Sequence, residues 1–139
     1  MTSPFAFTGN KFEFRMPGSS ASPSTPVFVL NTIVADILRE YADSLSENAS
    51  SKNINTSIIK LIKDRYKKHK RIIFNGNGYE GSWIEQAEEL GLSNLKNTIE
   101  GLPVYTKEET IALFERNGIL TREEVYSRYK IYCDRYNNQ

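Results

Sequence analysis

The sequence predicts a mainly helical α+β chain that begins with a short β-hairpin. Residues near the N-terminus alternate between apolar and charged, a period of two that is typical of a pleated strand. From about residue 30 onward, apolar residues instead recur every three or four positions, which is the spacing of amphipathic helices. Hydroxyl residues and glycines separate these stretches at places typical of helix starts and ends.

The predicted strand pair lies within residues 1–18. Residues 11–16 alternate between an apolar face, Phe12, Phe14 and Met16, and a charged face, Lys11, Glu13 and Arg15. Upstream, Phe5 and Phe7 alternate in the same way, and residues 8–10, Thr-Gly-Asn, suit a short loop between the two runs. The chain is therefore expected to begin with a hairpin or with two strands of a larger sheet.

The charged face of residues 11–16 is the main candidate site. Glu13 lies between Lys11 and Arg15, and neighbouring positive charge favours the ionised carboxylate. Mg²⁺ takes oxygen ligands, usually one or two from protein carboxylates, and phosphates and water complete its octahedron. Arg15 suits bidentate contact with phosphate oxygens, whereas Lys11 supplies a point charge. One prediction is thus a face that binds a metal ion and nucleotide phosphates.

A plainer alternative is an exposed strand face whose alternating charges form cross-strand ion pairs. Spacing alone favours this alternative, because a single carboxylate does not make a metal site. The residues by themselves leave both interpretations open.

The first helix is expected after a turn-rich segment at residues 17–26. Thr25 is its predicted N-cap, and Pro26 suits the first helical position. The helix itself follows from apolar residues at helical spacing: Leu30, Ile33, Val34, Ile37, Leu38, Tyr41 and Leu45. The polar residues 44–53 then predict a surface loop. Residues 19–139 are accordingly assigned to one helical segment that follows the strand pair in a single domain.

A second helix is predicted from the apolar positions Ile54, Ile58, Leu61, Ile62 and Tyr66. Its other face carries Lys60, Lys63, Lys67, Lys68 and Lys70. This cluster is either a phosphate or nucleic-acid surface, or a solvated face with positive charge near the C-terminus, where the helix dipole favours it. We favour the solvated face, because aromatic residues are not interleaved as base stacking requires.

Three capping boxes predict short helices in the C-terminal half: Ser82 with Glu85, Thr106 with Glu109, and Thr121 with Glu124. Gly91 and Gly118 are the expected stops of the first two helices. Trp83 and Tyr129 mark apolar helix faces that are expected to pack in a core or against another subunit. Residues 75–79 are glycine-rich but lack the lysine of a P-loop, which favours tight turns.

Composition excludes several classes of function. The 139 residues fit one domain, and 18 basic against 17 acidic residues give a formal charge of +1, which does not indicate a nucleic-acid or membrane partner. Cys133 and His69 are the only cysteine and the only histidine, so no disulfide, metal cluster or nucleophile–base pair is predicted. We expect a cytoplasmic protein. The abrupt start at Pro4 and the end after Tyr136 lead us to expect a piece of a longer chain.

Five stretches of the chain resemble one family. They are residues 2–15 (TSPFAFTGNKFEFR), 19–22 (SSAS), 29–35 (VLNTIVA), 69–79 (HKRIIFNGNGY) and 94–96 (NLK). In these stretches the chain resembles the C-terminal part of the catalytic region of glutamine synthetase, most closely the type III, large-subunit bacterial form. The resemblance spans nearly the full length of the chain.

The resemblance implies roles for the charged strand. Glu13 is implied as a ligand of the Mg²⁺ or Mn²⁺ ion that bridges the ATP phosphates. Lys11 would contact a nucleotide phosphate, and Arg15 would stabilise the transferred phosphoryl group or the glutamate substrate. Lys11 stands where many relatives have arginine, which weakens the case for bidentate phosphate contact there. The implied reaction is glutamine biosynthesis in nitrogen metabolism, in which ATP phosphorylates glutamate and ammonia then displaces phosphate.

Two hypotheses follow from these observations. In the first, the chain is a fragment of this ligase that contributes one metal- and phosphate-binding strand and is inactive alone, because the family's other metal ligands lie upstream of this segment. In the second, it is a helical module for subunit packing in the family's double-ring homo-oligomer and has no independent chemistry. The first needs Lys11, Glu13 and Arg15, whereas the second needs the apolar faces around Trp83 and Tyr129.

Overall fold

The computed structural model describes residues 5–7, 11–14, 22–47, 53–73 and 81–137. The chain divides into two compact units. The first unit comprises Met1–Val27 and Ser51–Asn94, and the second comprises Phe28–Ser50 and Leu95–Gln139. The predicted boundary between residues 18 and 19 falls outside the described residues and stays a prediction.

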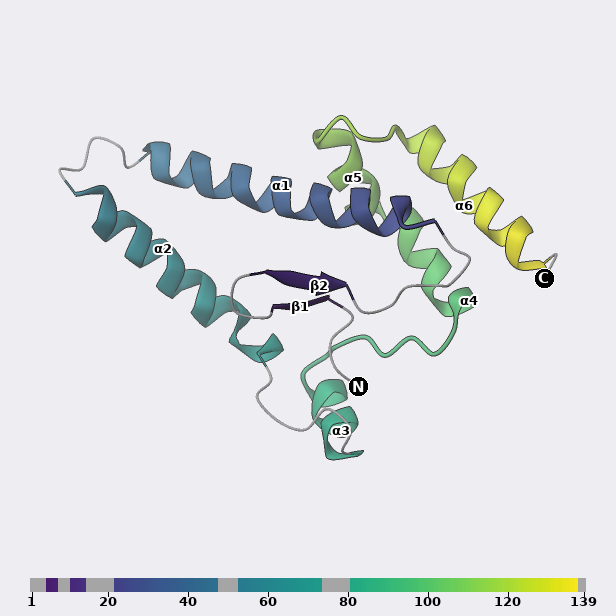
Figure 1. The fold of residues 1–139 in the computed structure, drawn as a ribbon, viewed down its shortest axis with the longest axis horizontal. Helices are drawn as coiled ribbons and strands as arrows, with labels where there is room; N and C mark the ends of the chain where they lie inside the picture. Colours follow the sequence, from purple (N-terminus) through teal and green to yellow (C-terminus); the bar gives the residue numbers. More distant parts are fainter. Residues whose placement is uncertain (1–4, 8–10, 15–21, 48–52, 74–80, 138–139) are drawn as a thin grey trace. The chain divides into compact units, whose positions relative to one another are not determined.

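The first unit holds a strand pair and two helices (Figure 1). Strands β1 (Phe5–Phe7) and β2 (Phe12–Phe14) pair antiparallel, with Phe5 opposite Phe14, Ala6 opposite Glu13 and Phe7 opposite Phe12. The predicted hairpin is therefore confirmed as a pair of three-residue strands. Its predicted loop at residues 8–10 lies outside the described residues, and its place in a larger sheet stays a prediction.

Helices α2 (Ile54–His69) and α3 (Gly81–Glu89) complete the first unit, and a short 3-10 helix, η1 (Lys70–Ile72), continues from α2. The predicted stop of α3 is confirmed. Gly91 has a φ of +68°, and the Leu92 N–H donates to the Ala87 carbonyl at 2.9 Å, which is the hydrogen bond of a Schellman cap. Arg71 Nη1 donates to the Leu90 carbonyl at 2.7 Å, so a side chain also closes this helix end.

The second unit is all helical in its described residues. Its elements are α1 (Ser24–Glu47, from Phe28 onward), α4 (Thr98–Gly101), the 3-10 helix η2 (Leu102–Thr106), α5 (Glu108–Arg116) and α6 (Arg122–Asn137). The short helices α4 and η2 follow each other directly in the chain. The chain is mainly helical overall, as its apolar spacing predicted.

A small apolar core holds the second unit together. Its buried side chains come from α5, α6 and the turn between them: Ile111, Phe114, Leu120 and Val125. Phe28, Val29 and Tyr105 pack around this core from α1 and η2. The centroid of the Phe114 ring lies 5.9 Å from that of Phe28 and 5.8 Å from that of Tyr105. Both pairs are tilted aromatic contacts.

Of the three predicted capping boxes, the one before α6 is confirmed. The Glu124 N–H donates to Thr121 Oγ1 at 3.3 Å, and the Thr121 N–H donates to the Glu124 carboxylate at 2.8 Å. Gly118 ends the preceding helix as predicted, with a φ of +63° and a bond of 3.0 Å from the Ile119 N–H to the Phe114 carbonyl.

The other predicted helix starts are wrong by one or two residues. Helix α5 begins at Glu108, with Lys107 at its N-cap position and no side-chain cap. Thr106 does not cap it, because Thr106 ends η2 and its hydroxyl donates to the Pro103 carbonyl. Helix α3 begins at Gly81, which places Ser82 inside the first turn. Helix α1 begins at Ser24, ahead of the predicted cap at Thr25. No helix among the described residues is long and apolar enough to cross a membrane.

Candidate functional site

The predicted charged strand is described only in part. Glu13 lies in a strand, β2, as the alternation predicted, and the register places it opposite Ala6. Lys11 directly precedes β2, and its side chain is exposed. Arg15 lies outside the described residues, as do the glycine-rich residues 75–79. The roles of Lys11, Glu13 and Arg15 therefore stay predictions.

The donor set of this strand fits a metal ion only as part of a larger site. Glu13 offers one carboxylate, and Mg²⁺ accepts one or two protein carboxylates beside phosphate and water. Nowhere in the described part of the chain do three or more His, Cys, Asp or Glu residues gather closely enough to hold a metal ion. A metal site at Glu13 would therefore need further oxygen ligands, and the role of Glu13 as one of them stays a prediction.

The lysine-rich face of α2 and η1 is exposed to solvent throughout. The exposed side chains include Lys60, Lys63, Lys67, Lys68, His69 and Lys70. Arg71, at the end of this run, has a structural role because its guanidinium binds the Leu90 carbonyl at the end of α3. Positive charge therefore collects at the C-terminal end of α2, where the helix dipole favours it.

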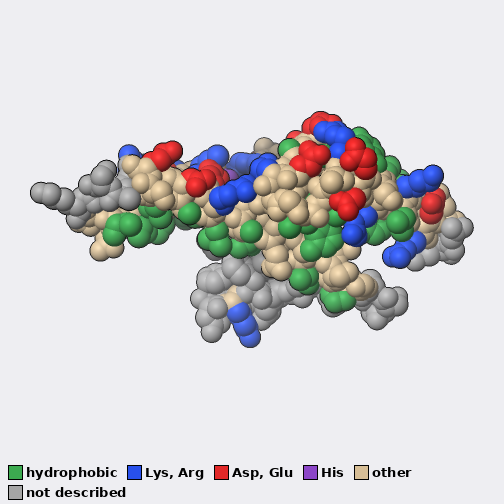
Figure 2. Space-filling model, turned by 90° about the horizontal axis from the view of Figure 1, so that it is seen from above, with side chains coloured by type: hydrophobic (Ala, Val, Ile, Leu, Met, Phe, Trp, Pro, Cys, Tyr) green, Lys and Arg blue, Asp and Glu red, His purple; other side chains and the backbone are tan. Residues whose placement is uncertain are grey.

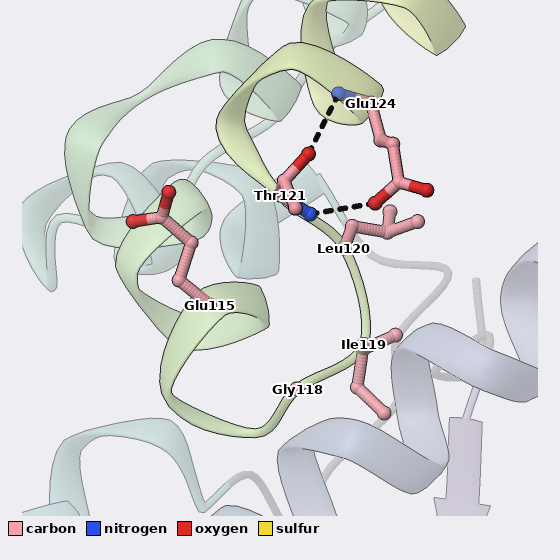
Figure 3. Close-up of a pocket in the computed structure, with 6 residues that line it drawn as sticks. All are labelled: Glu115, Gly118, Ile119, Leu120, Thr121 and Glu124. Carbon is pink, nitrogen blue, oxygen red and sulfur yellow. Dashed lines mark hydrogen bonds between the residues drawn. The ribbon is translucent and has the colours of Figure 1, made fainter.

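An open pocket of about 300 Å³ lies at the turn between α5 and α6. Its lining consists of Glu115, Gly118, Ile119, Leu120, Thr121 and Glu124. Figure 3 shows the carboxylates of Glu115 and Glu124 well apart, with the Thr121–Glu124 capping box beside the pocket. Glu115 accepts the Arg122 N–H at 3.2 Å. Both acids thus stabilise the start of α6, which makes the pocket a structural feature of the turn.

A dense polar cluster surrounds Asp36 on α1 in the second unit. Its carboxylate accepts from Arg116 Nε at 2.8 Å and Arg116 Nη2 at 2.5 Å, from Arg39 Nη2 at 2.8 Å and from Asn117 Nδ2 at 3.0 Å. Arg39 also donates from Nη1 to the Arg116 carbonyl at 3.1 Å, at the end of α5. The hydrogen bonds from Arg116 and then Asn117 hold the pKa of Asp36 well below its usual range.

This cluster attaches α1 to the C-terminal end of α5. Because two arginines and an amide already bind one carboxylate, the arrangement is a structural clamp and leaves little capacity for a ligand. Sequence reasoning missed it, since Asp36 and Arg116 lie 80 residues apart. The only local sign was the i, i+3 pair of Asp36 with Arg39.

A second clamp joins α5 to α6. Arg122 donates to both carboxylate oxygens of Glu108, at 2.7 Å and 2.6 Å. This bidentate contact lowers the pKa of Glu108 and raises that of Arg122. Tyr105, in η2, has a buried hydroxyl with no hydrogen-bond partner among the described residues, and burial raises its pKa.

Comparison with known proteins agrees with the resemblance noted in the sequence. Residues 57–139 match the model of the glutamine synthetase C-terminal domain. The chain is 46% identical over 136 residues to a type-3 glutamine synthetase of Dictyostelium discoideum, in an alignment that covers 98% of the chain and 18% of that protein. It is 39% identical over 142 residues to a glutamine synthetase of Butyrivibrio fibrisolvens and 33% identical over 138 residues to one of Bacteroides fragilis.

The last two alignments each cover 97% of the chain and 19% of the relative. The chain therefore spans about a fifth of the length of the curated relatives it matches. More than half of its residues match the domain model, and nearly all of them align with the relatives. This chain belongs to the glutamine synthetase C-terminal domain family.

Proposed function

We propose that this chain is part of a type III glutamate–ammonia ligase, to which it contributes one metal- and phosphate-binding strand. The proposal rests on one observation above all, the 46% identity over nearly the whole chain to a protein named type-3 glutamine synthetase. The pairing of β2 with β1 supports it further, because Glu13 then lies on a hydrogen-bonded strand.

Three residues carry the proposed chemistry. Glu13 binds the Mg²⁺ or Mn²⁺ ion of the intact enzyme, Lys11 contacts a phosphate of ATP, and Arg15 stabilises the transferred phosphoryl group or glutamate. The metal, when bound, neutralises charge that develops on the phosphoryl oxygens. In the intact enzyme the substrates are glutamate, ammonia and ATP, and the partners are other subunits of a homo-oligomer in the cytoplasm.

The isolated chain is expected to be inactive as a synthetase. Glu13 offers one metal ligand, and Mg²⁺ in phosphoryl-transfer sites is held by several oxygens in a fixed geometry. Incubation of the pure chain with ATP, glutamate, ammonia and Mg²⁺ should therefore produce no glutamine above background. Glutamine formation that depends on both ATP and ammonia would contradict this prediction.

The test of the site is a calorimetric titration of Mg·ATP into the 139-residue chain and two variants. Glu13→Ala removes the proposed ligand, whereas Glu85→Ala removes an exposed glutamate of α3 and serves as the matched control. We expect binding in the wild type and in Glu85→Ala, and its loss in Glu13→Ala. Equal binding in Glu13→Ala and in the wild type would overturn the assignment of Glu13. Absence of heat in the wild type would mean that the strand binds Mg·ATP only within the intact enzyme.

A second candidate is a subunit-packing module, which exposed apolar side chains on α1 favour. Ile33, Val34, Ile37 and Leu38 are between 39% and 58% exposed. Figure 2 shows hydrophobic side chains open on one face of the molecule among charged groups. Trp83 and Tyr129, predicted to carry such packing, are half-buried. A helix of a soluble protein usually buries its apolar residues. The exposed apolar residues of α1 therefore favour a further packing partner.

A further inference from the structure

We propose that α1 of one copy of this chain packs in parallel against α2 of a second copy. Each helix offers a strip in which exposed apolar residues lie beside a row of charge, acidic on α1 and basic on α2. The proposal deepens the subunit-packing candidate and rests on it. It uses no residue of the nucleotide-binding strand, so the two can fail separately.

The strip on α1 lies beside the face that contacts the core. Phe28 and Val29 pack against the core and Thr32 is 4% exposed, so these residues define the inner face of the helix. Ile33 and Ile37, on the neighbouring face, remain 42% and 39% exposed. Acidic residues follow along the helix at i, i+3 and i+7, all of them exposed: Glu40, Asp43 and Glu47.

The strip on α2 has the same composition with the opposite charge. Ile59, Ile62 and Tyr66 are 53%, 61% and 57% exposed. A row of exposed lysines lies beside them at i, i+4 and i+7: Lys63, Lys67 and Lys70. Residues three and four apart are neighbours on a helix surface, so each charged row is continuous and about as long as the other.

The flank on which each charged row lies decides whether the two helices pair parallel or antiparallel. At about 100° per residue, the acidic row lies on one flank of the apolar residues of α1, and the lysine row lies on the opposite flank of those of α2. In a parallel helix pair, opposite flanks face each other, as e and g positions do in a parallel coiled coil. The acidic and basic rows therefore meet in a parallel pair, whereas an antiparallel pair would separate them.

The short connection between α1 and α2 favours a second copy of the chain as the partner in this helix pair. Only residues 48–53 connect α1 to α2. If residues 40–47 lay parallel to residues 63–70 of the same chain, the connection would have to run back along α1 for about 24 Å. At about 3.5 Å per residue, it could span this length only when fully stretched. A second copy meets no such constraint, and closed two-fold dimers are the commonest homo-oligomers.

Sedimentation velocity of the 139-residue chain at increasing concentration is the first measurement. We expect a dimer that dissociates as NaCl is raised, because screening weakens ion pairs at exposed positions. A chain that stays monomeric at low salt over the whole concentration range would overturn the proposal.

Charge reversals test the two rows. Asp43→Lys with Glu47→Lys reverses the row on α1, and Lys63→Glu with Lys67→Glu reverses the row on α2. Each double variant alone is expected to weaken dimerisation by about tenfold or more, because like charges then face each other. An equimolar mixture should restore the dimer, since the two reversed rows complement each other. Glu88→Lys with Glu89→Lys, on the exposed face of α3, is the control for the α1 reversal and has the same charge change.

The outcomes separate the alternatives. Dimers that survive both reversals, or a control that weakens them equally, would show that the charged rows do not form the contact. If a charge-reversed variant loses helicity by circular dichroism, Ile59→Ser removes an exposed apolar side chain and should still weaken the dimer. Failure of dimerisation with intact Mg·ATP binding would reject this interface and leave the ligase proposal standing.

Discussion

At Asp36, the structure assigns a role that the sequence did not reveal. Its carboxylate binds Arg116, Arg39 and Asn117, and Arg116 has the largest effect in lowering its pKa from an ordinary value of 3.8. A carboxylate with a lowered folded-state pKa stabilises the fold above its unfolded pKa. That contribution is lost as pH falls below this value toward the folded pKa.

Asp36→Asn should therefore destabilise the second unit at pH 7 and do so less as the pH falls below about 3.8. The variant keeps the size of the side chain but loses the charge that both arginines bind. Urea unfolding at pH 7 and at several pH values below 4 measures the difference in midpoint. Asp43→Asn, an exposed carboxylate on the same helix, is the control. A difference that stays constant across this range would contradict the assignment.

At the scale of elements, helix ends were predicted better than helix starts. Gly91 and Gly118 both adopt positive φ and both end a helix. A glycine in this conformation closes the helix through hydrogen bonds within six residues, so its effect is readable from the local sequence. The start of α5 differs from its prediction because the Thr106 hydroxyl donates to the Pro103 carbonyl in the preceding turn. The cap at Asn97, which accepts the Glu100 N–H at 3.0 Å, had a readable Asn-x-x-Glu signal that we missed.

Two glycine substitutions should change stability in opposite directions. An alanine Cβ at Gly118 meets no atom within 4 Å, but the φ of +63° is strained for alanine, so Gly118→Ala should cost about 1 kcal/mol. Gly101 has a φ of −79°, and its nearest contact would be Leu95 Cδ1 at 4.0 Å. Gly101→Ala should therefore stabilise by about 0.5 kcal/mol. Chemical denaturation of both variants measures this pair, and a shift in the same direction would contradict the backbone explanation.

At the scale of the whole molecule, the two units differ in how much they bury. All the buried side chains among the described residues belong to the second unit. The only tryptophan, Trp83, belongs to the first unit, so its fluorescence reports on that unit. Far-UV circular dichroism includes the helices of the second unit. The two signals can therefore distinguish one cooperative transition from two.

Phe114→Ala should lower the stability of the second unit by roughly 3–5 kcal/mol, a large part of the 5–15 kcal/mol typical of a domain. Phe114 is 1% exposed and lies at the centre of the aromatic contacts. The helical signal should melt earlier, while the Trp83 signal keeps its midpoint. Ile99→Ala, at a side chain 57% exposed, is the control and should change neither signal. Equal shifts of both signals would mean that the two units unfold together.

The sequence by itself determined the family, the positions of the helices and strands, and the helix stops at Gly91 and Gly118. These features depend on periodicity and on hydrogen bonds between residues close in the chain, which local composition encodes. Only the tertiary structure decided that Asp36 binds Arg116, that Arg122 binds Glu108 and that Phe28 covers Phe114. Such contacts depend on how distant segments pack, and neither charge nor spacing along the chain specifies which acid meets which base.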